Sequence, residues 1–347
     1  MPFRTLPARD AAGARLAAAL DACQRMTAHA APRRRGRRLI VLAVAIVLAG
    51  CSVNDLLLNP EEARDTQAAD PVDPAANGDV ARKITVENRA GNKLVGWLFS
   101  ARGDRGIVLA AGGNGTGTPH TYAYNRFLLH HGFRVLVFSY QGFDQNEGVA
   151  DIGSIAGDVE AFHSYAARQF PGEPIGFVGE SIGAIAGLCG AAGDYAVMSL
   201  EGLIDPSSIA YTIIDSYVPA PLSYVLSFTF HPGAVLYEGA VPGELNARDC
   251  AARNERTAML FLNQRKDPVS SLALVRELAQ AHPAHITVLE LPDSAAHPHL
   301  VVSHSRDAQA RIVAFIKTHL KTQAADRPAR KPSPPGGHAA SRVAIVD

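Results

Sequence analysis

The decisive stretch of the chain is Gly179-Glu180-Ser181-Ile182-Gly183, which fits the pattern Gly-x-Ser-x-Gly. The apolar run 174–178 before it predicts a buried strand, and the small apolar residues 184–190 after it predict a helix packed close to a sheet. A strand that turns at once into a helix strains the backbone, and flanking glycines remove the Cβ clashes that would forbid the turn. Such a turn presents a serine hydroxyl at the end of a sheet. The alternative is a glycine-rich turn whose serine caps the helix.

Strands and helices alternate around this turn. Residues 83–88 and 93–100 predict a hairpin joined through residues 89–92. Further strands are predicted at 106–111, 134–140, 175–178, 195–200, 257–263 and 285–291, and helices at 120–131, 155–169 and 305–321. Such alternation is typical of an α/β fold, a mostly parallel central sheet with helices on both faces and a site at the carboxyl ends of the strands.

The order of these segments predicts how the chain is divided. The folded domain is expected at 82–321, and residues 205–250, which break the alternation, are expected to form a small inserted lid. Residues 51–81 are polar, acidic and interrupted by prolines, which predicts a disordered tether. The proline-rich residues 322–347 predict a disordered tail.

The first 50 residues have the pattern of an export signal. Five arginines between Arg33 and Arg38 precede eleven uncharged residues, 39–49, which are too few to span a bilayer as a helix. A basic segment followed by an apolar one of this length predicts a secretory signal peptide, with Met26 as a better-placed start than Met1. A buried helix ending at Gly50 is the alternative.

The end of this signal resembles a bacterial lipobox, Leu48-Ala49-Gly50-Cys51. That resemblance implies that Cys51 carries lipid and becomes the mature N-terminus, so that the membrane is a partner of the protein. Ser52 follows the cysteine, which implies the outer membrane of a Gram-negative bacterium, facing the periplasm.

The rest of the chain is mildly acidic. The first 50 residues hold nine Arg and two Asp, which leaves 24 basic and 31 acidic residues, a net charge of −7, in residues 51–347. This balance argues against a nucleic-acid partner. Cys189 and Cys250 are the cysteines left beside Cys23 and Cys51, and two separate buried thiols are favoured over a disulfide.

Two polar residues follow predicted strands at positions that suit a serine nucleophile. Asp267 comes after strand 257–263, and His297 comes after strand 285–291. A serine hydroxyl needs a base within hydrogen-bond reach, and the base needs an orienting acid. The order Ser181, Asp267, His297 is that of the α/β-hydrolase fold. The sequence therefore predicts a triad at one end of the sheet.

Several alternatives to this triad remain open. His299 competes with His297 as the base, and Asp293 is a weaker rival to Asp267. His297-Pro298-His299 could chelate a metal, but no carboxylate or cysteine lies at a convincing ligand spacing. No metal or organic cofactor is expected.

A glycine-rich loop, residues 111–117, follows strand 106–111. An oxyanion hole needs backbone N–H groups directed at the developing charge. Ile182, just after the serine, and Asn114, in this loop, are the predicted donors. A phosphate-binding loop is the alternative, but the P-loop lysine is missing.

These residues resemble α/β-hydrolases of the serine aminopeptidase-like, monoacylglycerol-lipase-like group. That group has His-Gly-Asn-Gly in the loop, and here Gly113, Asn114 and Gly115 match while Gly112 replaces the histidine. Its next segment reads Asp-Tyr-Arg-Gly-x-Gly-x-Ser-x-Gly, of which residues 139–148 keep Tyr140, Gly142 and Gly148 and lose the Asp, the Arg and the Ser.

The resemblance covers about 82–321 and implies a serine hydrolase that cleaves a carboxylic ester, small or lipid, through an acyl-enzyme. An acyltransferase that uses the same triad is one alternative. A non-catalytic lipoprotein that binds a partner in the cell envelope is the other. The oligomeric state is not predicted.

Overall fold

The computed structural model describes residues 58–69, 79–100, 103, 105–206, 245–267, 269–293 and 297–326. All of them belong to one compact unit, Leu57–Asp347. The predicted signal peptide, Cys51, most of the predicted lid (207–244) and the tail from residue 327 lie outside the described residues.

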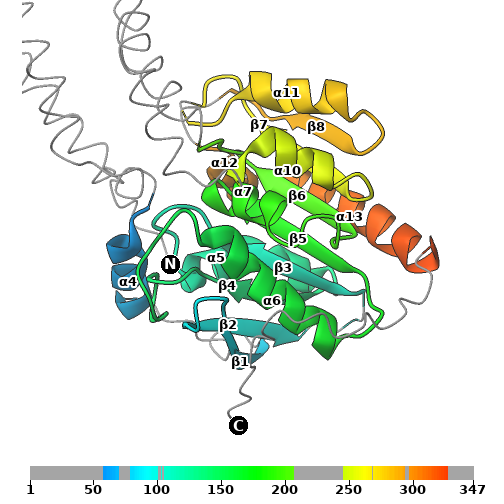
Figure 1. Cartoon of the computed structure of the whole chain (residues 1–347). Helices are drawn as coiled ribbons and strands as arrows, with labels where there is room; N and C mark the ends of the chain where they lie inside the picture. The colour runs from blue at the N-terminus through cyan, green and yellow to red at the C-terminus, as the bar shows by residue number, and fades with distance from the viewer. Residues whose placement is uncertain are drawn as a thin grey trace, which may run out of the picture. The chain divides into compact units, whose positions relative to one another are not determined.

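An eight-stranded sheet forms the centre of this unit, in the order β1-β2-β4-β3-β5-β6-β7-β8 (Figure 1). The predicted hairpin is confirmed, since β1 and β2 pair antiparallel, and β2 also runs antiparallel to β4. All the other pairs are parallel. The strands are β1 (Val80–Glu87), β2 (Lys93–Ser100), β3 (Ile107–Ala111), β4 (Arg134–Phe138), β5 (Ile175–Glu180), β6 (Val197–Glu201), β7 (Ala258–Asn263) and β8 (Ile286–Glu290).

Helices cover both faces of the sheet, as predicted. On one face, α5 (Thr118–His130) and α13 (Arg306–Asp326) pack in one apolar cluster with alternate strand residues such as Val108. On the other face lie α6 (Ile155–Gln169) and α7 (Ile182–Cys189), where Phe162 of α6 stacks on Phe138 of β4 at 4.2 Å between ring centroids. Within the described ranges, no helix is long and apolar enough to cross a membrane.

Four further helices were not predicted from the sequence: α4 (Pro60–Ala69), α10 (Ala247–Arg253), α11 (Leu272–Ala281) and α12 (Pro298–His304). The prediction of a disordered tether is wrong for the residues of α4. Burial of the apolar side chains of Leu58 and Ala63 offsets the conformational entropy lost when this segment becomes ordered. The last residues of the predicted lid, 247–250, fall in α10, which packs on α7. At the other end, α13 continues to Asp326, five residues into the predicted tail.

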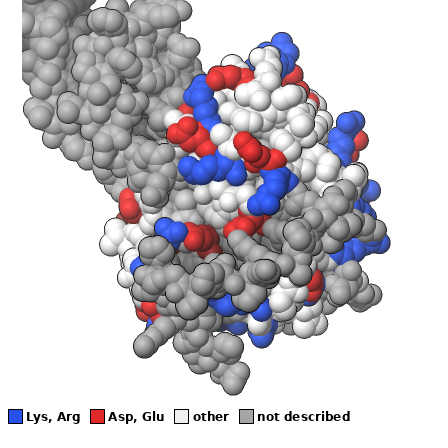
Figure 2. Space-filling view, turned by 45° about the vertical axis from the view of Figure 1, so that its right-hand side comes forward, with Lys and Arg blue, Asp and Glu red and all other residues white. Residues whose placement is uncertain are grey.

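Charged side chains on the described surface are mixed in sign. Arg248 pairs with Glu277 at 2.8 Å, and both Arg265 and Arg276 pair with Glu290. Figure 2 shows basic and acidic residues interspersed over the face that it displays. In this view the described residues form no field of a single sign such as a nucleic-acid site presents.

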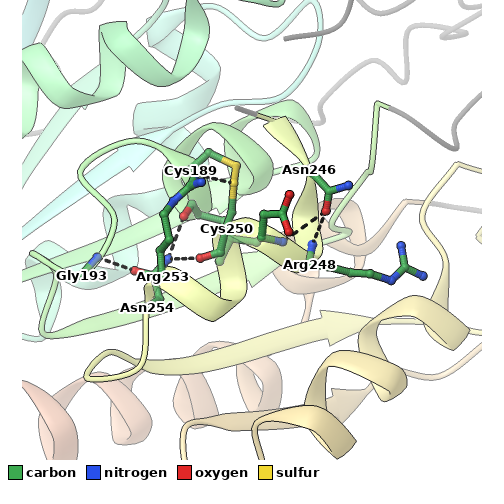
Figure 3. Close-up of a disulfide and its surroundings, with 9 residues drawn as sticks. Cys189, Gly193, Asn246, Arg248, Cys250, Arg253 and Asn254 are labelled. Carbon is green, nitrogen blue, oxygen red and sulfur yellow. Dashed lines mark hydrogen bonds between the residues drawn. A yellow bond between two sulfur atoms is a disulfide. The ribbon is translucent and has the colours of Figure 1, made fainter. Parts of the chain in front are cut away.

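Cys189 at the end of α7 and Cys250 in α10 form a disulfide (Figure 3). Asn254 holds the same junction, because its Nδ2 donates to the carbonyl oxygens of Leu188 and Cys250, both at 2.8 Å. The prediction of two separate thiols is therefore wrong. The two cysteines are 61 residues apart in the chain, so their proximity depends on the packing of α10 against α7.

Candidate functional site

Ser181 lies at the strained turn that the sequence predicts. It directly follows β5 and precedes α7, and its φ of 53° lies in the left-handed region that L-residues other than glycine rarely adopt. Its side chain makes no capping hydrogen bond to α7, which removes the support for the helix-cap alternative. Gly183 permits the close packing, because a Cβ there would lie 2.5 Å from the carbonyl oxygen of Ala111 in β3.

Asp267 and His297 meet at the carboxyl end of the sheet. His297 Nδ1 lies 2.6 Å from Asp267 Oδ2, and the Asp267 side chain is fully buried. Asp267 also accepts hydrogen bonds from the N–H groups of Val269 and Ser270 and from the Ser270 hydroxyl. Burial acts to raise the pKa of Asp267, but the hydrogen bond and charge of His297 and the other donors hold the pKa below its usual value. The carboxylate is therefore ionised and orients the imidazole ring.

Ser181 and His297 both lie against the end of β6. The Ser181 N–H donates to the carbonyl oxygen of Glu201 at 2.8 Å. A Cβ on the next residue, Gly202, would lie 2.7 Å from His297 Nε2. Gly202 also has a φ of +63°, so both its conformation and the adjacent ring require glycine. Serine and histidine thus contact the same two-residue segment.

The rival residues are placed differently. Asp293 lies on the surface, where Lys266 Nζ is 3.9 Å from its Oδ2. His299 falls in α12, and its side chain lies outside the described part of the structure. Among the described residues, no group of three or more His, Cys, Asp or Glu side chains is arranged to hold a metal ion.

The glycine-rich loop lies beside Ser181. A Cβ on Gly113 would be 3.3 Å from the Cβ of Ser181, and Thr116 N–H donates to the Gly113 carbonyl oxygen to close a tight turn at Asn114-Gly115. Ile182 is the first residue of α7, so its N–H has no acceptor within that helix. Of the two predicted oxyanion donors, Ile182 thus follows Ser181 directly in the chain, and Asn114 follows Gly113, the loop residue beside Ser181.

The altered segment 139–148 supports this loop with its own residues. Tyr140 donates its hydroxyl to the Gly112 carbonyl oxygen at 2.9 Å. Asp144, whose φ of 48° is also left-handed, accepts through Oδ2 from the Thr118 N–H at 3.0 Å and from the Ser139 hydroxyl at 2.5 Å. Asp144 thus links Ser139, just after β4, to the start of α5, just after the glycine-rich loop.

Comparisons with solved structures match the fold that carries these residues. An esterase from Pyrococcus furiosus is similar over 72% of this chain and 94% of its own, at 17% identity and a TM-score of 0.56. An α/β-hydrolase from Vibrio vulnificus is similar over 70% of this chain and 82% of its own, at 15% identity and a TM-score of 0.54. The chain has the α/β-hydrolase fold. No protein-family model and no curated protein matches the sequence.

Within this α/β-hydrolase fold, two buried carboxyl groups lie next to the serine, and the sequence analysis missed them. Glu180 and Glu201 are cross-strand partners at the ends of β5 and β6, so their side chains lie on the same face of the sheet. Burial, followed by the charge of Glu201, raises the pKa of Glu180 well above its usual value, and the Gly113 N–H opposes that rise. The available signal was an acidic residue at the end of each of two apolar strands.

Replacing Glu201 with glutamine is expected to stabilise the protein increasingly as the pH rises from about 4.5 to about 8. Burial raises the pKa of Glu201 from 4.5 to about 8. A carboxyl whose pKa is raised in the folded state contributes stability that is fully present below about pH 4.5 and lost as the pH rises through 8. Glutamine does not ionise, so the free energy of unfolding of Glu201→Gln should exceed that of wild type by a few kcal/mol at pH 8.5 and match it near pH 4.

Urea unfolding at both pH values measures this difference, with the exposed Glu255→Gln as the control that should change stability at neither pH. An equal effect of Glu201→Gln at both pH values would contradict burial of an ionisable group.

Proposed function

We propose that the protein is a serine hydrolase that cleaves a carboxylic ester. The observation that carries the proposal is the 2.6 Å contact of His297 with the buried Asp267, at the sheet edge where Ser181 occupies a strained turn. A residue other than glycine in a left-handed backbone conformation is costly, and such strain is concentrated at functional sites.

The chemistry follows from these positions. Ser181 Oγ attacks the ester carbonyl carbon while His297 Nε2 takes the hydroxyl proton, and Asp267 stabilises the imidazolium that forms. The N–H groups of Asn114 and Ile182 bind the oxyanion. When the carbon–oxygen bond breaks, His297 returns the proton to the leaving alcohol and an acyl-enzyme remains. Water, deprotonated by His297, then releases the acid and frees Ser181.

A fluorophosphonate probe tests the proposal directly. Wild-type protein should be labelled, and mass spectrometry should place the phosphonyl group on the peptide that contains Ser181. Nitrophenyl esters of graded chain length then measure the acyl pocket. Product analysis with an added alcohol separates hydrolysis from acyl transfer, because a transferase yields a new ester. A folded protein that the probe leaves unlabelled would overturn the proposal and favour a binding role.

We further propose that a lipid on Cys51 anchors the protein in the cell envelope. Cys51 itself lies outside the described residues. The basic segment, the apolar segment and the lipobox-like Leu48–Cys51 support this anchor. The Cys189–Cys250 disulfide agrees with it, because disulfides persist in oxidising compartments such as the periplasm.

The anchor would also favour membrane-borne substrates. Seven residues lie between Cys51 and Asn59, the residue before α4. Because an extended chain spans at most about 3.6 Å per residue, lipid on Cys51 limits the distance from α4 to the membrane surface to roughly 30 Å. Acyl esters in or near the membrane are therefore the substrates that the enzyme would meet most often.

Replacing Cys51 with serine is expected to abolish lipid attachment. In cells fed an alkyne-labelled fatty acid, the wild-type protein should carry label and sediment with membranes, and Cys51→Ser should do neither, because serine lacks the sulfur to which the lipid is attached. Cys23→Ser is the matched control and should behave as wild type. Label retained in Cys51→Ser would contradict the proposed anchor.

A further inference from the structure

Helix α4 begins with a capping motif in which the backbone N–H of the capping residue, Asn59, is bonded by the glycine-rich loop. Asn59 precedes Pro60, and its side-chain oxygen faces the N–H of Glu62 at 3.4 Å while its Nδ2 donates to Glu62 Oε2 at 2.8 Å. In an ordinary capping box the glutamate side chain accepts from the N–H of the capping residue. Here that N–H, from Asn59, donates to Oδ1 of Asn114. The helix start and the loop thus complete each other's hydrogen bonds.

The same helix packs directly on the glycines of the loop. A Cβ on Gly115 would lie 2.6 Å from Glu62 Oε2, and a Cβ on Gly117 would lie 2.9 Å from the carbonyl oxygen of Ala63. Ala63 is fully buried and Leu58 is nearly so. A larger residue at 117 would meet the backbone of α4, whereas one at 115 would meet the flexible end of the Glu62 side chain, so Gly117 is the position that the close packing of the helix requires.

The loop needs such support because it is rich in glycine. Gly112, Gly113, Gly115 and Gly117 lie within six residues, and a glycine backbone loses more conformational entropy on ordering than any other. Tyr140 holds the loop at Gly112, and Asp144 holds it beyond Gly117, at Thr118. Between these two attachments, the side chain of Asn114 is held by α4.

We propose that α4 clamps the glycine-rich loop and is the positioning element that directs the Asn114 N–H toward the substrate oxyanion. The clamp rests on the oxyanion role proposed above for Asn114. It assigns a function to a segment that lies between the membrane signal and the catalytic domain in the chain. It also makes attachment of α4 a condition for full activity.

Releasing the helix should therefore reduce turnover more than substrate binding. Loss of one oxyanion donor costs about 10²–10³-fold in kcat. A donor that is present but poorly held should reduce kcat by part of that factor, about 10–100-fold. KM should stay within about threefold of wild type, since the donor acts mainly on the transition state.

Ala63→Asp in the full chain is the releasing variant, because a charge cannot be buried without a partner at this position. Arg64→Asp introduces the same residue on the exposed side of α4 and should keep kcat within twofold. Ala63→Ser keeps the small volume and should retain most activity. Ala63→Asp combined with Asn114→Ala should lose less than the product of the two single effects, because both act on one contact.

Amide hydrogen exchange of residues 112–117 provides a second readout that does not need catalysis. In Ala63→Asp the loop should exchange faster while the sheet stays protected, and in Arg64→Asp it should not. Unchanged kcat in Ala63→Asp, or unchanged loop exchange, would overturn the clamp. If the wild-type protein hydrolyses no ester, the proposed function fails. Hydrogen exchange still tests the contact itself: faster exchange of the loop in Ala63→Asp supports it, and unchanged exchange contradicts it.

Discussion

Ser181→Ala should lose at least about 10⁴-fold in kcat/KM toward nitrophenyl esters and all labelling by a fluorophosphonate probe. The expected loss is large because, under the proposed mechanism, the variant has no atom at position 181 that can form the acyl-enzyme. Steady-state kinetics and intact-protein mass spectrometry measure the two effects.

Ser199→Ala is the matched control for this variant. Ser199 lies in the neighbouring strand β6, fully buried, and its hydroxyl makes no hydrogen bond among the described residues. Its replacement should leave labelling and turnover close to wild type. Turnover that survives in Ser181→Ala would point to another nucleophile and would remove the basis of the proposed function.

His297→Ala should have a comparably large effect, about 10⁴-fold or more on kcat, while His299→Ala should change kcat less than threefold. His297 carries the ring that lies 2.6 Å from Asp267 and beside Gly202. Without it, Ser181 loses the proposed base that takes its proton, and Asp267 loses its hydrogen-bond partner.

The pair of variants also decides the ambiguity that the sequence left between two histidines in one loop. The thermal unfolding midpoint of each variant, measured alongside kcat, separates loss of catalysis from loss of fold. A large loss of kcat in His299→Ala with His297→Ala still active would reverse the assignment.

Much of the architecture was predictable because it depends on local patterns. Apolar runs predicted all eight strands, with boundaries shifted by at most three residues, and the turn at Ser181 followed from its glycines. The α4 helix was missed although Asn59-Pro60-Glu61-Glu62 is a typical helix start, because the surrounding sequence is polar and, of the side chains described at 58–65, Leu58 and Ala63 are the ones that are buried.

The sequence by itself determined the order of strands and helices, the strained serine and the candidates Asp267 and His297, since each depends on neighbouring residues. Tertiary structure alone decided that His297 meets Asp267, that Cys189 bonds Cys250, that Glu180 and Glu201 lie side by side, and that Asn59 reaches Asn114. Each of these pairs is at least 21 residues apart in the chain. Their contacts depend on strand order and helix packing, which no local pattern encodes.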